Sequence, residues 1–225
     1  PSQDTLNTGN VHGKAWIPAE CDVSIRPGWF WHENENSKVK TPEELFSLYL
    51  KSVGRGANLL LNVPPDRRGL IHENDSAALV GFRQLLEKSF ASNISRRGTG
   101  YFNPHNGARQ VSGLNDGNPR TLETIVAPDR SSMGIEFADS QRINCVVLKE
   151  YLEKGQHTRS FRLLLMSKKH ELLREIKGTS IGRKRILTFP TTNVGLIGLA
   201  IDDQQGYTAI TEIQTYLIDE KLLEK

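Results

Sequence analysis

The stretch TPEELFSLYLKSVGRGANLLLNVPP, residues 41–65, holds a helix pattern followed directly by a strand pattern. Thr41 is placed as the N-cap of an amphipathic helix, with Pro42 at its first position and Glu44 completing a capping box. Apolar residues then recur at helical spacing until Gly54, which can end the helix. The nearly continuous apolar run that follows stops at two prolines, as expected for a parallel strand covered on both faces. The sequence here predicts α/β architecture.

The same order of elements extends on both sides of this stretch. A strand pattern precedes it at 20–26, and a second amphipathic helix is expected at about 74–91. Residues 1–95 therefore form two strand–helix units, whereas a (β/α)8 barrel takes on the order of 200 residues. We expect these residues to be the carboxyl-terminal portion of a barrel whose other part, a missing partner sequence, lies upstream. The start without Met is consistent with a cut inside a longer protein.

The strand pattern at 20–26 alternates polar and apolar residues. Glu20, Asp22, Ser24 and Arg26 would share one face, because successive side chains of a strand point to opposite sides. Barrel strands are normally apolar on both faces, and polar groups near their carboxyl ends point at the place where barrel active sites lie. The row therefore predicts a site lining. An exposed antiparallel strand with one wet face is the alternative.

Aromatic residues follow this strand directly. Trp29 and Trp31, next to His32, offer flat apolar surfaces with polar tips, a type of surface that stacks on sugar rings. Such a loop can equally serve ordinary packing. Asn62, at the end of the second strand pattern, is another candidate polar group at a strand terminus. Its alternative role is a turn-forming side chain bonded to the proline-rich loop after it.

Several classes of function are not indicated. Glu20 and Asp22 approach from the same side, whereas a glycosidase needs carboxyl groups on both sides of the scissile bond, so at most one of them is catalytic. No metal or other cofactor is predicted, since the histidines are scattered and no metal-ligand or phosphate-loop motif occurs. The net charge of +3 is dispersed, which argues against a nucleic-acid partner. No apolar run approaches the roughly 20 residues of a membrane span.

The character of the sequence changes after about residue 95. Residues 98–121 are rich in Gly, Asn and Pro and look dominated by turns. Short alternating strand patterns then recur without helices between them, at 133–137, 143–147, 161–165, 197–201 and 213–217. This spacing predicts that residues 96–225 form an antiparallel β-sandwich. Two cysteines, one in each predicted domain, are expected to be buried free thiols.

These motifs resemble a known family. WIPAECDVSIRPGWFWH at 16–32 and KTPEELFSLYLKSVGRGANLLLNVPPDRRGLI at 40–71 are similar to the carboxyl-terminal part of the catalytic barrel of α-L-fucosidases of glycoside hydrolase family 29. The resemblance covers about the first 92 residues. It implies a (β/α)8-like barrel and retaining hydrolysis of terminal α-L-fucose by an Asp nucleophile and a Glu acid/base. The nucleophile would lie upstream of residue 1.

The resemblance leaves two roles open for Glu20. In one branch of the family the acid/base is the Glu of a W-E-x-C-x-S-I pattern, which Glu20 matches by position. In the branch with the S-I-R-P-G-W-F form, which this sequence has, the acid/base lies on an earlier loop. Glu20 is then a pocket residue together with Asp22 and Arg26, while residues 29–32 shape the side that holds the aglycone.

The second domain resembles the discoidin, or coagulation factor type C, sandwich appended to many fucosidases. Such modules can bind galactose-type sugars through aromatic, Arg and His residues. The candidates here, Tyr101, His105, Arg109 and Tyr207, form no obvious platform, which favours a domain that braces the barrel. The expected partner is a fucosylated glycan substrate, and the resemblance implies an extracytoplasmic location: periplasmic, secreted or lysosome-like. A non-catalytic carbohydrate-binding or structural module is the alternative.

Overall fold

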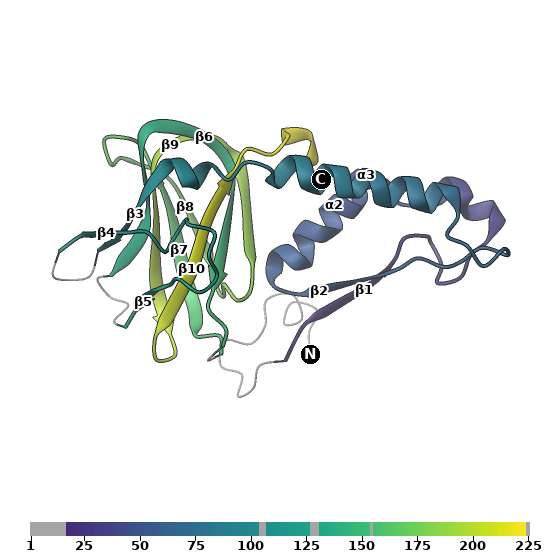
Figure 1. Cartoon of the computed structure of the whole chain (residues 1–225), viewed down its shortest axis with the longest axis horizontal. Helices are drawn as coiled ribbons and strands as arrows, with labels where there is room; N and C mark the ends of the chain where they lie inside the picture. Colours follow the sequence, from purple (N-terminus) through teal and green to yellow (C-terminus); the bar gives the residue numbers. More distant parts are fainter. Residues whose placement is uncertain (1–16, 104–106, 127–130, 154, 224–225) are drawn as a thin grey trace. The chain divides into compact units, whose positions relative to one another are not determined.

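The computed structural model describes residues 17–103, 107–126, 131–153 and 155–223 and divides the chain into two compact units. We call Pro18–Ala91 with Asp219–Lys225 the helical unit, and Pro1–Ile17 with Ser92–Ile218 the sheet unit. Figure 1 shows the elements of both units along the chain. Each unit has its own hydrophobic core, so each is described by itself.

The helical unit alternates strands and helices as predicted. Its elements are β1 (Glu20–Ser24), η1 (Glu33–Lys38), α2 (Pro42–Lys51), η2 (Val53–Arg55), β2 (Asn58–Asn62), α3 (Glu73–Phe90) and η5 (Glu220–Leu222). Strands β1 and β2 are parallel, with Glu20 opposite Asn58 and Ser24 opposite Asn62. A parallel pair needs a crossover connection, which α2 provides.

The capping signals in the sequence form the helix start that they predict. The Thr41 hydroxyl accepts a 3.2 Å hydrogen bond from the Glu44 backbone N–H, and the Glu44 carboxylate accepts one of 2.8 Å from the Thr41 N–H. Two backbone donors that a helix leaves unpaired are thus satisfied. The second helix, α3, begins after His72, whose ring Nδ1 accepts from the Asn74 N–H at 3.1 Å.

The core of the helical unit lies between the strands and the helices. Ile25, Leu45 and Ala78 are buried at its centre. Partly buried apolar side chains pack around them: Val39, Leu48, Leu61, Val63, Leu79 and Phe82. The apolar face of β2 and the apolar stripes of both helices meet here, as their periodicities require.

The sheet unit is built from antiparallel strands. They are β3 (Gly98–Asn103), β4 (Arg109–Val111), β5 (Glu123–Ile125), β6 (Ser132–Glu150), β7 (Thr158–Met166), β8 (Leu172–Gly178), β9 (Arg185–Gln204) and β10 (Thr208–Tyr216). The main order is β4-β3-β6-β9-β7-β8, and β10 pairs with β6 and β5. Every strand pair of this unit is antiparallel, which confirms the predicted strand type.

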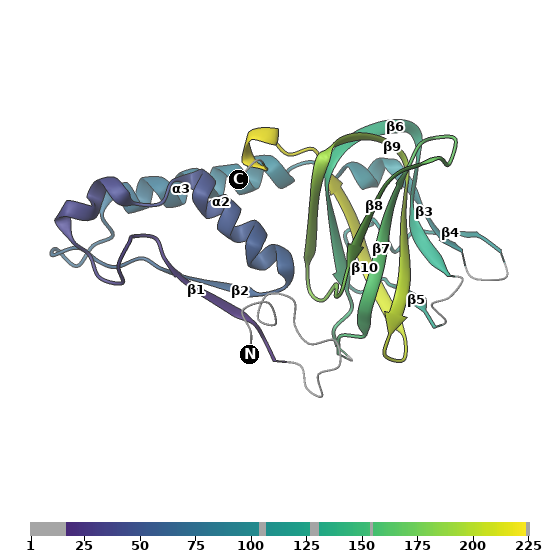
Figure 2. The same cartoon turned by 180° about the vertical axis from the view of Figure 1, so that it is seen from behind.

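Two long strands, β6 and β9, pair with different neighbours along their length (Figure 2). The first part of β6, Ser132 to Glu136, pairs with β3 and with the end of β9. Its last part, Cys145 to Glu150, pairs with β10 and with the start of β9. Register shifts interrupt the β6–β9 ladder between these parts.

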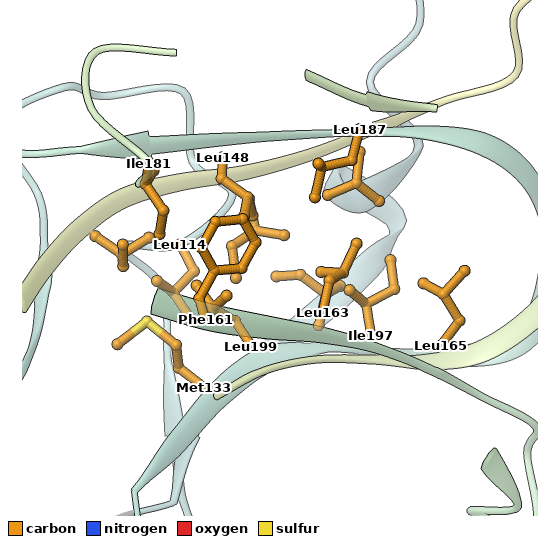
Figure 3. Close-up of a cluster of buried hydrophobic side chains, with 14 of the residues drawn as sticks. Leu114, Met133, Leu148, Phe161, Leu163, Leu165, Ile181, Leu187, Ile197 and Leu199 are labelled. Carbon is orange, nitrogen blue, oxygen red and sulfur yellow. The ribbon is translucent and has the colours of Figure 1, made fainter. Parts of the chain in front are cut away.

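The core of the sheet unit is a cluster of buried apolar side chains (Figure 3). In this view Leu148 points toward Phe161, and Leu187 points toward Leu163 and Ile197. Most of the side chains that meet here have no exposed surface, and Phe161 is only 1% exposed. Burial of these side chains supplies the main stabilisation of the unit.

Three expectations about this part of the chain are corrected. The patterns at 133–137 and 143–147 belong to one strand, β6, and β8 was not expected. The segment predicted to be dominated by turns contains β3 and β4. Its glycines serve close contact between backbones, since a Cβ at Gly100 would lie 2.4 Å from the Val111 carbonyl oxygen.

Candidate functional site

The polar face of β1 is exposed at its first residues. The Glu20 and Asp22 side chains lie on the open face, while Cys21 and Val23 are half-buried on the other. The Glu20 carboxylate accepts a 3.1 Å hydrogen bond from the Asn58 amide of β2. Leu60, which is 49% exposed, lies opposite Asp22 on the neighbouring strand. This face can offer carboxylate acceptors to sugar hydroxyls beside an apolar surface.

The carboxyl ends of both strands are hydrogen-bonded to the loop that follows β1. This loop carries Trp29, Phe30 and Trp31, and we call it the aromatic loop. The Asn62 amide donates to the Ser24 hydroxyl at 3.2 Å and to the Trp29 carbonyl at 2.8 Å. The Ser24 hydroxyl in turn donates to the Gly28 carbonyl at 2.7 Å. Asn62 therefore bonds to the loop after β1, rather than to the proline-rich loop after its own strand.

Arg26 does not continue the polar row. The strand ends at Ser24, and Arg26 is only 1% exposed. Its Nη2 lies 2.7 Å from Asp75 Oδ2, and its Nε lies 3.1 Å from each of the two Asp75 oxygens. Its Nη1 donates to the His32 carbonyl at 3.3 Å. The expectation that Arg26 lines the site with Glu20 and Asp22 is wrong in geometry, because the chain turns after the strand and buries the guanidinium against α3.

The three aromatic residues of the loop have different surroundings. Trp29 is 49% exposed and Phe30 is 77% exposed. Trp31 is half-buried, with the guanidinium carbons of Arg26 and Arg67 5.9 and 6.0 Å from its ring centroid. The ring of His72 lies 6.3 Å away. Within the part of the chain that the structure describes, the buried Trp31 Nε1 has no hydrogen-bond partner.

A cavity of about 720 Å³ opens beside Trp31. It is lined by residues 30–34 of the aromatic loop and 64–67 of the loop after β2. Trp31 and His32 therefore belong to its wall, and their role in substrate binding stays a prediction. The other predicted site residues, Glu20, Asp22, Trp29 and Asn62, are not among those that line it.

The loop after β2 contributes the other wall of the cavity, and ion pairs of Arg68 stabilise this loop. Hydrogen bonding to the Arg68 guanidinium is the main cause that lowers the pKa of Asp66 from its ordinary 3.8 to about 2. Arg68 also pairs with Glu73, with 2.8 Å between Nη2 and Oε1. The Asp66 carboxylate also accepts a hydrogen bond of 2.8 Å from the Arg68 backbone N–H, and this bond shapes the turn. Arg67 is exposed at the cavity, and its guanidinium faces the Trp31 ring.

Sequence reasoning missed three residues of this arrangement: Asp66, Arg67 and Asp75. The first two follow the prolines that end β2, in a loop read only as a stop signal. Asp75 carries a signal that could have been used. It stands in helical register with Ala78, Leu79 and Phe82, so a carboxylate occupies a position of the buried stripe.

The structure places no metal centre or membrane helix among the described residues. No group of three or more His, Cys, Asp or Glu side chains in 17–103, 107–126, 131–153 and 155–223 is placed to hold a metal ion. No helix within those ranges is both long and apolar enough to cross a bilayer.

Loops of the sheet unit form an aromatic pair that the sequence did not reveal. The rings of His157 and Tyr207 are stacked with 4.7 Å between centroids and 21° between planes. Arg159 Nη2 donates to the Gln205 side-chain oxygen at 2.9 Å, next to this pair. Of the other candidates, Tyr101 donates at 3.5 Å to the Ile197 carbonyl. Arg109 pairs with Glu123 at 2.6 Å, and His105 lies outside the described residues.

Comparison with known proteins places this geometry in a family. Residues 2–89 match the family model described as Alpha-L-fucosidase. The chain corresponds to the carboxyl-terminal part of a glycoside hydrolase family 29 α-L-fucosidase. The Arabidopsis thaliana protein Alpha-L-fucosidase 1 is 36% identical to this chain over 193 residues. That match covers 80% of this chain but only 37% of the relative, so the chain spans well under half of the plant protein.

Solved structures extend the likeness to both units. A Ruminococcus gnavus family 29 fucosidase in complex with fucose is 25% identical to this chain, with a TM-score of 0.79. The match covers 95% of this chain and 44% of the solved one. A family 29 member from an unknown rumen bacterium is 28% identical, with a TM-score of 0.74, and the match covers 92% of this chain and 34% of the solved one. The α-L-fucosidase likeness is therefore not limited to the residues that the family model matches.

Proposed function

We propose that the protein to which this chain belongs hydrolyses terminal α-L-fucose from glycans with retention of configuration. The observation that carries the proposal is the likeness to α-L-fucosidases in sequence over residues 2–89 and in fold over more than 90% of the chain. The nucleophile Asp belongs to the part of the catalytic domain outside this chain. We expect this chain alone to be inactive.

The site residues take different roles in this proposal. Glu20 is either the acid/base or a pocket residue, and its exposed position on β1 is compatible with both. A proton donor works best in enclosed, apolar surroundings, whereas the Glu20 side chain is exposed in this chain. Asp22 offers a second acceptor on the same face. Trp31 and His32 line a cavity, and in this proposal they would shape the side that holds the aglycone.

The two units have separate places in the proposed enzyme. Residues 1–95 would supply the last strand–helix units of a (β/α)8-like barrel, with β1 and β2 joined to parallel strands of the upstream sequence. Residues 96–225 would form a discoidin-like β-sandwich that braces the barrel. The proposed location of the enzyme is extracytoplasmic.

The proposal is tested by hydrolysis of para-nitrophenyl α-L-fucoside and of a branched fucosylated trisaccharide. The chain and a form extended upstream to a complete catalytic domain are compared, and only the extended form is expected to be active. Glu20→Gln then separates the two roles, with Glu87→Gln as a surface control on α3. A loss of kcat by about 100-fold or more that azide restores assigns the acid/base to Glu20. A small loss, or one that azide does not restore, makes it a pocket residue. No hydrolysis of any α-L-fucoside by the extended form would contradict the proposal.

The stacked pair of His157 and Tyr207 favours a second candidate, a carbohydrate-binding function of the sheet unit. Stacked rings beside a guanidinium and an amide, as in His157, Tyr207, Arg159 and Gln205, can contact the apolar face and the hydroxyls of a sugar. Binding of the whole chain to a glycan array, lost in Tyr207→Ala but kept in the surface variant Glu87→Gln, would support it. Binding unchanged by Tyr207→Ala would remove it.

A further inference from the structure

The ion pair between Arg26 and Asp75 is the most completely buried charged contact among the described residues. Both side chains have 0% exposed surface, and three nitrogen–oxygen distances of 2.7 to 3.1 Å join them. Burial of two charges is costly, so such a pair is poor evidence for a contribution to stability alone. The role of this ion pair therefore lies in the groups that it keeps in position.

The Arg26 guanidinium also contacts the aromatic loop, on the side that does not face Asp75. Arg26 Nη1 donates to the His32 carbonyl, and the guanidinium carbon lies 5.9 Å from the centroid of Trp31. Trp31 and His32 are wall residues of the 720 Å³ cavity. Asn74, next to Asp75, adds a second tie by donating to the Asn36 carbonyl at 2.8 Å. The start of α3 is thus bonded directly to η1 at Asn36 and, through Arg26, to the aromatic loop at His32.

We propose that Asp75 is a positioning residue that acts through Arg26 to fix Trp31 and His32 in the wall of the substrate cavity. Asp75 does not line the cavity itself. It sets the orientation of the guanidinium by bidentate contact, and the guanidinium then fixes the loop by one backbone bond and one ring contact. The substrate part of this inference rests on the proposed function.

The test replaces the pair without leaving a buried charge. Arg26→Met combined with Asp75→Leu keeps most of the buried volume, and substitutions of this kind are often neutral for stability. Arg83→Gln combined with Glu87→Gln is the control, since it removes an ion pair of 2.7 Å on the exposed face of the same helix. Circular dichroism and urea unfolding establish that both double variants are folded. Asp75→Asn is the conservative variant, because its amide keeps one acceptor for Arg26; unlike the double variant it leaves the Arg26 charge buried without a counter-charge, so its folding is checked in the same way.

Kinetics of the extended enzyme provide the first readout. For the branched trisaccharide we expect the Arg26→Met/Asp75→Leu variant to raise KM about 10-fold with kcat changed less than about 3-fold, because the loop binds substrate and takes no part in bond breaking. Asp75→Asn should fall between this variant and the wild type, and the Arg83/Glu87 control should match the wild type. An unchanged KM in the folded Arg26→Met/Asp75→Leu variant would overturn the inference. A fall in kcat by a similar factor with KM unchanged would overturn it too.

Fluorescence of Trp31 provides a readout that needs no activity. With Trp16→Phe and Trp29→Phe in the background, Trp31 is the remaining tryptophan of the chain. Loss of the ion pair should shift its emission to the red and increase quenching by acrylamide. Unchanged emission and quenching would show that the loop keeps its place without the pair. An extended enzyme with no fucosidase activity would refute the proposed function instead, and Trp31 fluorescence would still decide whether Asp75 positions the loop.

Discussion

The side-chain amide of Asn62 donates a 2.8 Å hydrogen bond to the carbonyl oxygen of Trp29, 33 residues earlier in the chain. The same amide donates to the Ser24 hydroxyl at 3.2 Å. One side chain at the end of β2 therefore fixes both the end of β1 and the loop that follows it. Neither contact could be read from a sequence in which Asn62 precedes two prolines.

Asn62→Ala should destabilise the helical unit by about 1 to 2 kcal/mol, because it removes two hydrogen bonds and leaves the Trp29 carbonyl without its donor. Urea unfolding followed by tryptophan fluorescence measures the effect, since Trp29 and Trp31 both belong to this unit. Asn58→Ala on the same strand is the control, because Asn58 is exposed and its side-chain amide donates to the exposed Glu20 carboxylate. Equal effects of the two substitutions would contradict the role assigned to Asn62.

Acid should weaken the loop after β2 through Asp66. Its pKa is lowered from 3.8 to about 2, chiefly by hydrogen bonding to Arg68, so the folded state favours the carboxylate. That stabilisation is fully present above the ordinary pKa and is lost as pH falls through about 2. The difference in unfolding free energy between the wild type and Asp66→Asn should be constant above about pH 5 and shrink from pH 4 to 2. A difference that grows on acidification would have the wrong sign.

The two cysteines should differ in reactivity. Cys145 is fully buried, and this burial raises the pKa of its thiol, so little thiolate is available. Cys21 is half-buried on β1 and also free. Titration with a disulfide reagent at neutral pH should modify Cys21 in the native chain and Cys145 only after addition of denaturant. Cys21→Ser, which should leave no fast-reacting thiol, is the control. Rapid modification of Cys145 in that variant would contradict its burial.

Removing the charge of Glu150 without changing its size should lower the stability of the sheet unit. One carboxylate oxygen accepts from the His157 and Thr158 N–H groups at 2.7 and 2.9 Å, and the other accepts from the Gly182 N–H at 3.0 Å. Glu150→Gln turns an NH₂ group toward at least one of these donors and should cost about 2 to 3 kcal/mol.

Thermal and urea unfolding of the sheet unit, followed by far-ultraviolet circular dichroism, measures this loss. Glu136→Gln is the matched control, since Glu136 stands on the same strand with a side chain that is 48% exposed. An equal stability of the two variants would show that the three backbone contacts of Glu150 carry no net energy.

The sequence predicted elements well where one local signal decides them. The capping box at Thr41 and the two proline stops after β2 placed α2 and β2 within about one or two residues of their observed ends. The strands of the sheet unit with regular apolar alternation were also found. Strand β3 was missed because its glycines, which usually mark turns, here let Gly98 and Gly100 approach neighbouring strands closely.

The candidate site was predicted less completely, because its contacts join distant segments. Trp31 and His32 were recognised from their residue types, and the structure places both in a cavity wall. The position of Arg26 was mistaken, because extrapolating the alternation beyond Ser24 ignores that the strand ends there. Its partner Asp75 lies 49 residues later, on a helix whose buried face cannot be matched to a particular arginine by periodicity.

Strands β6 and β9 pair with each other along most of their length and also carry the neighbouring strands β3, β7 and β10, which has a consequence for how the sheet unit opens. The β6–β9 ladder cannot be lost while these neighbours keep their pairing, because the same two backbones carry hydrogen bonds to all of them. Amide protons of β6 and β9 should therefore exchange with solvent at one common rate set by global opening, whereas those of β4 and β8 at the sheet ends should exchange earlier.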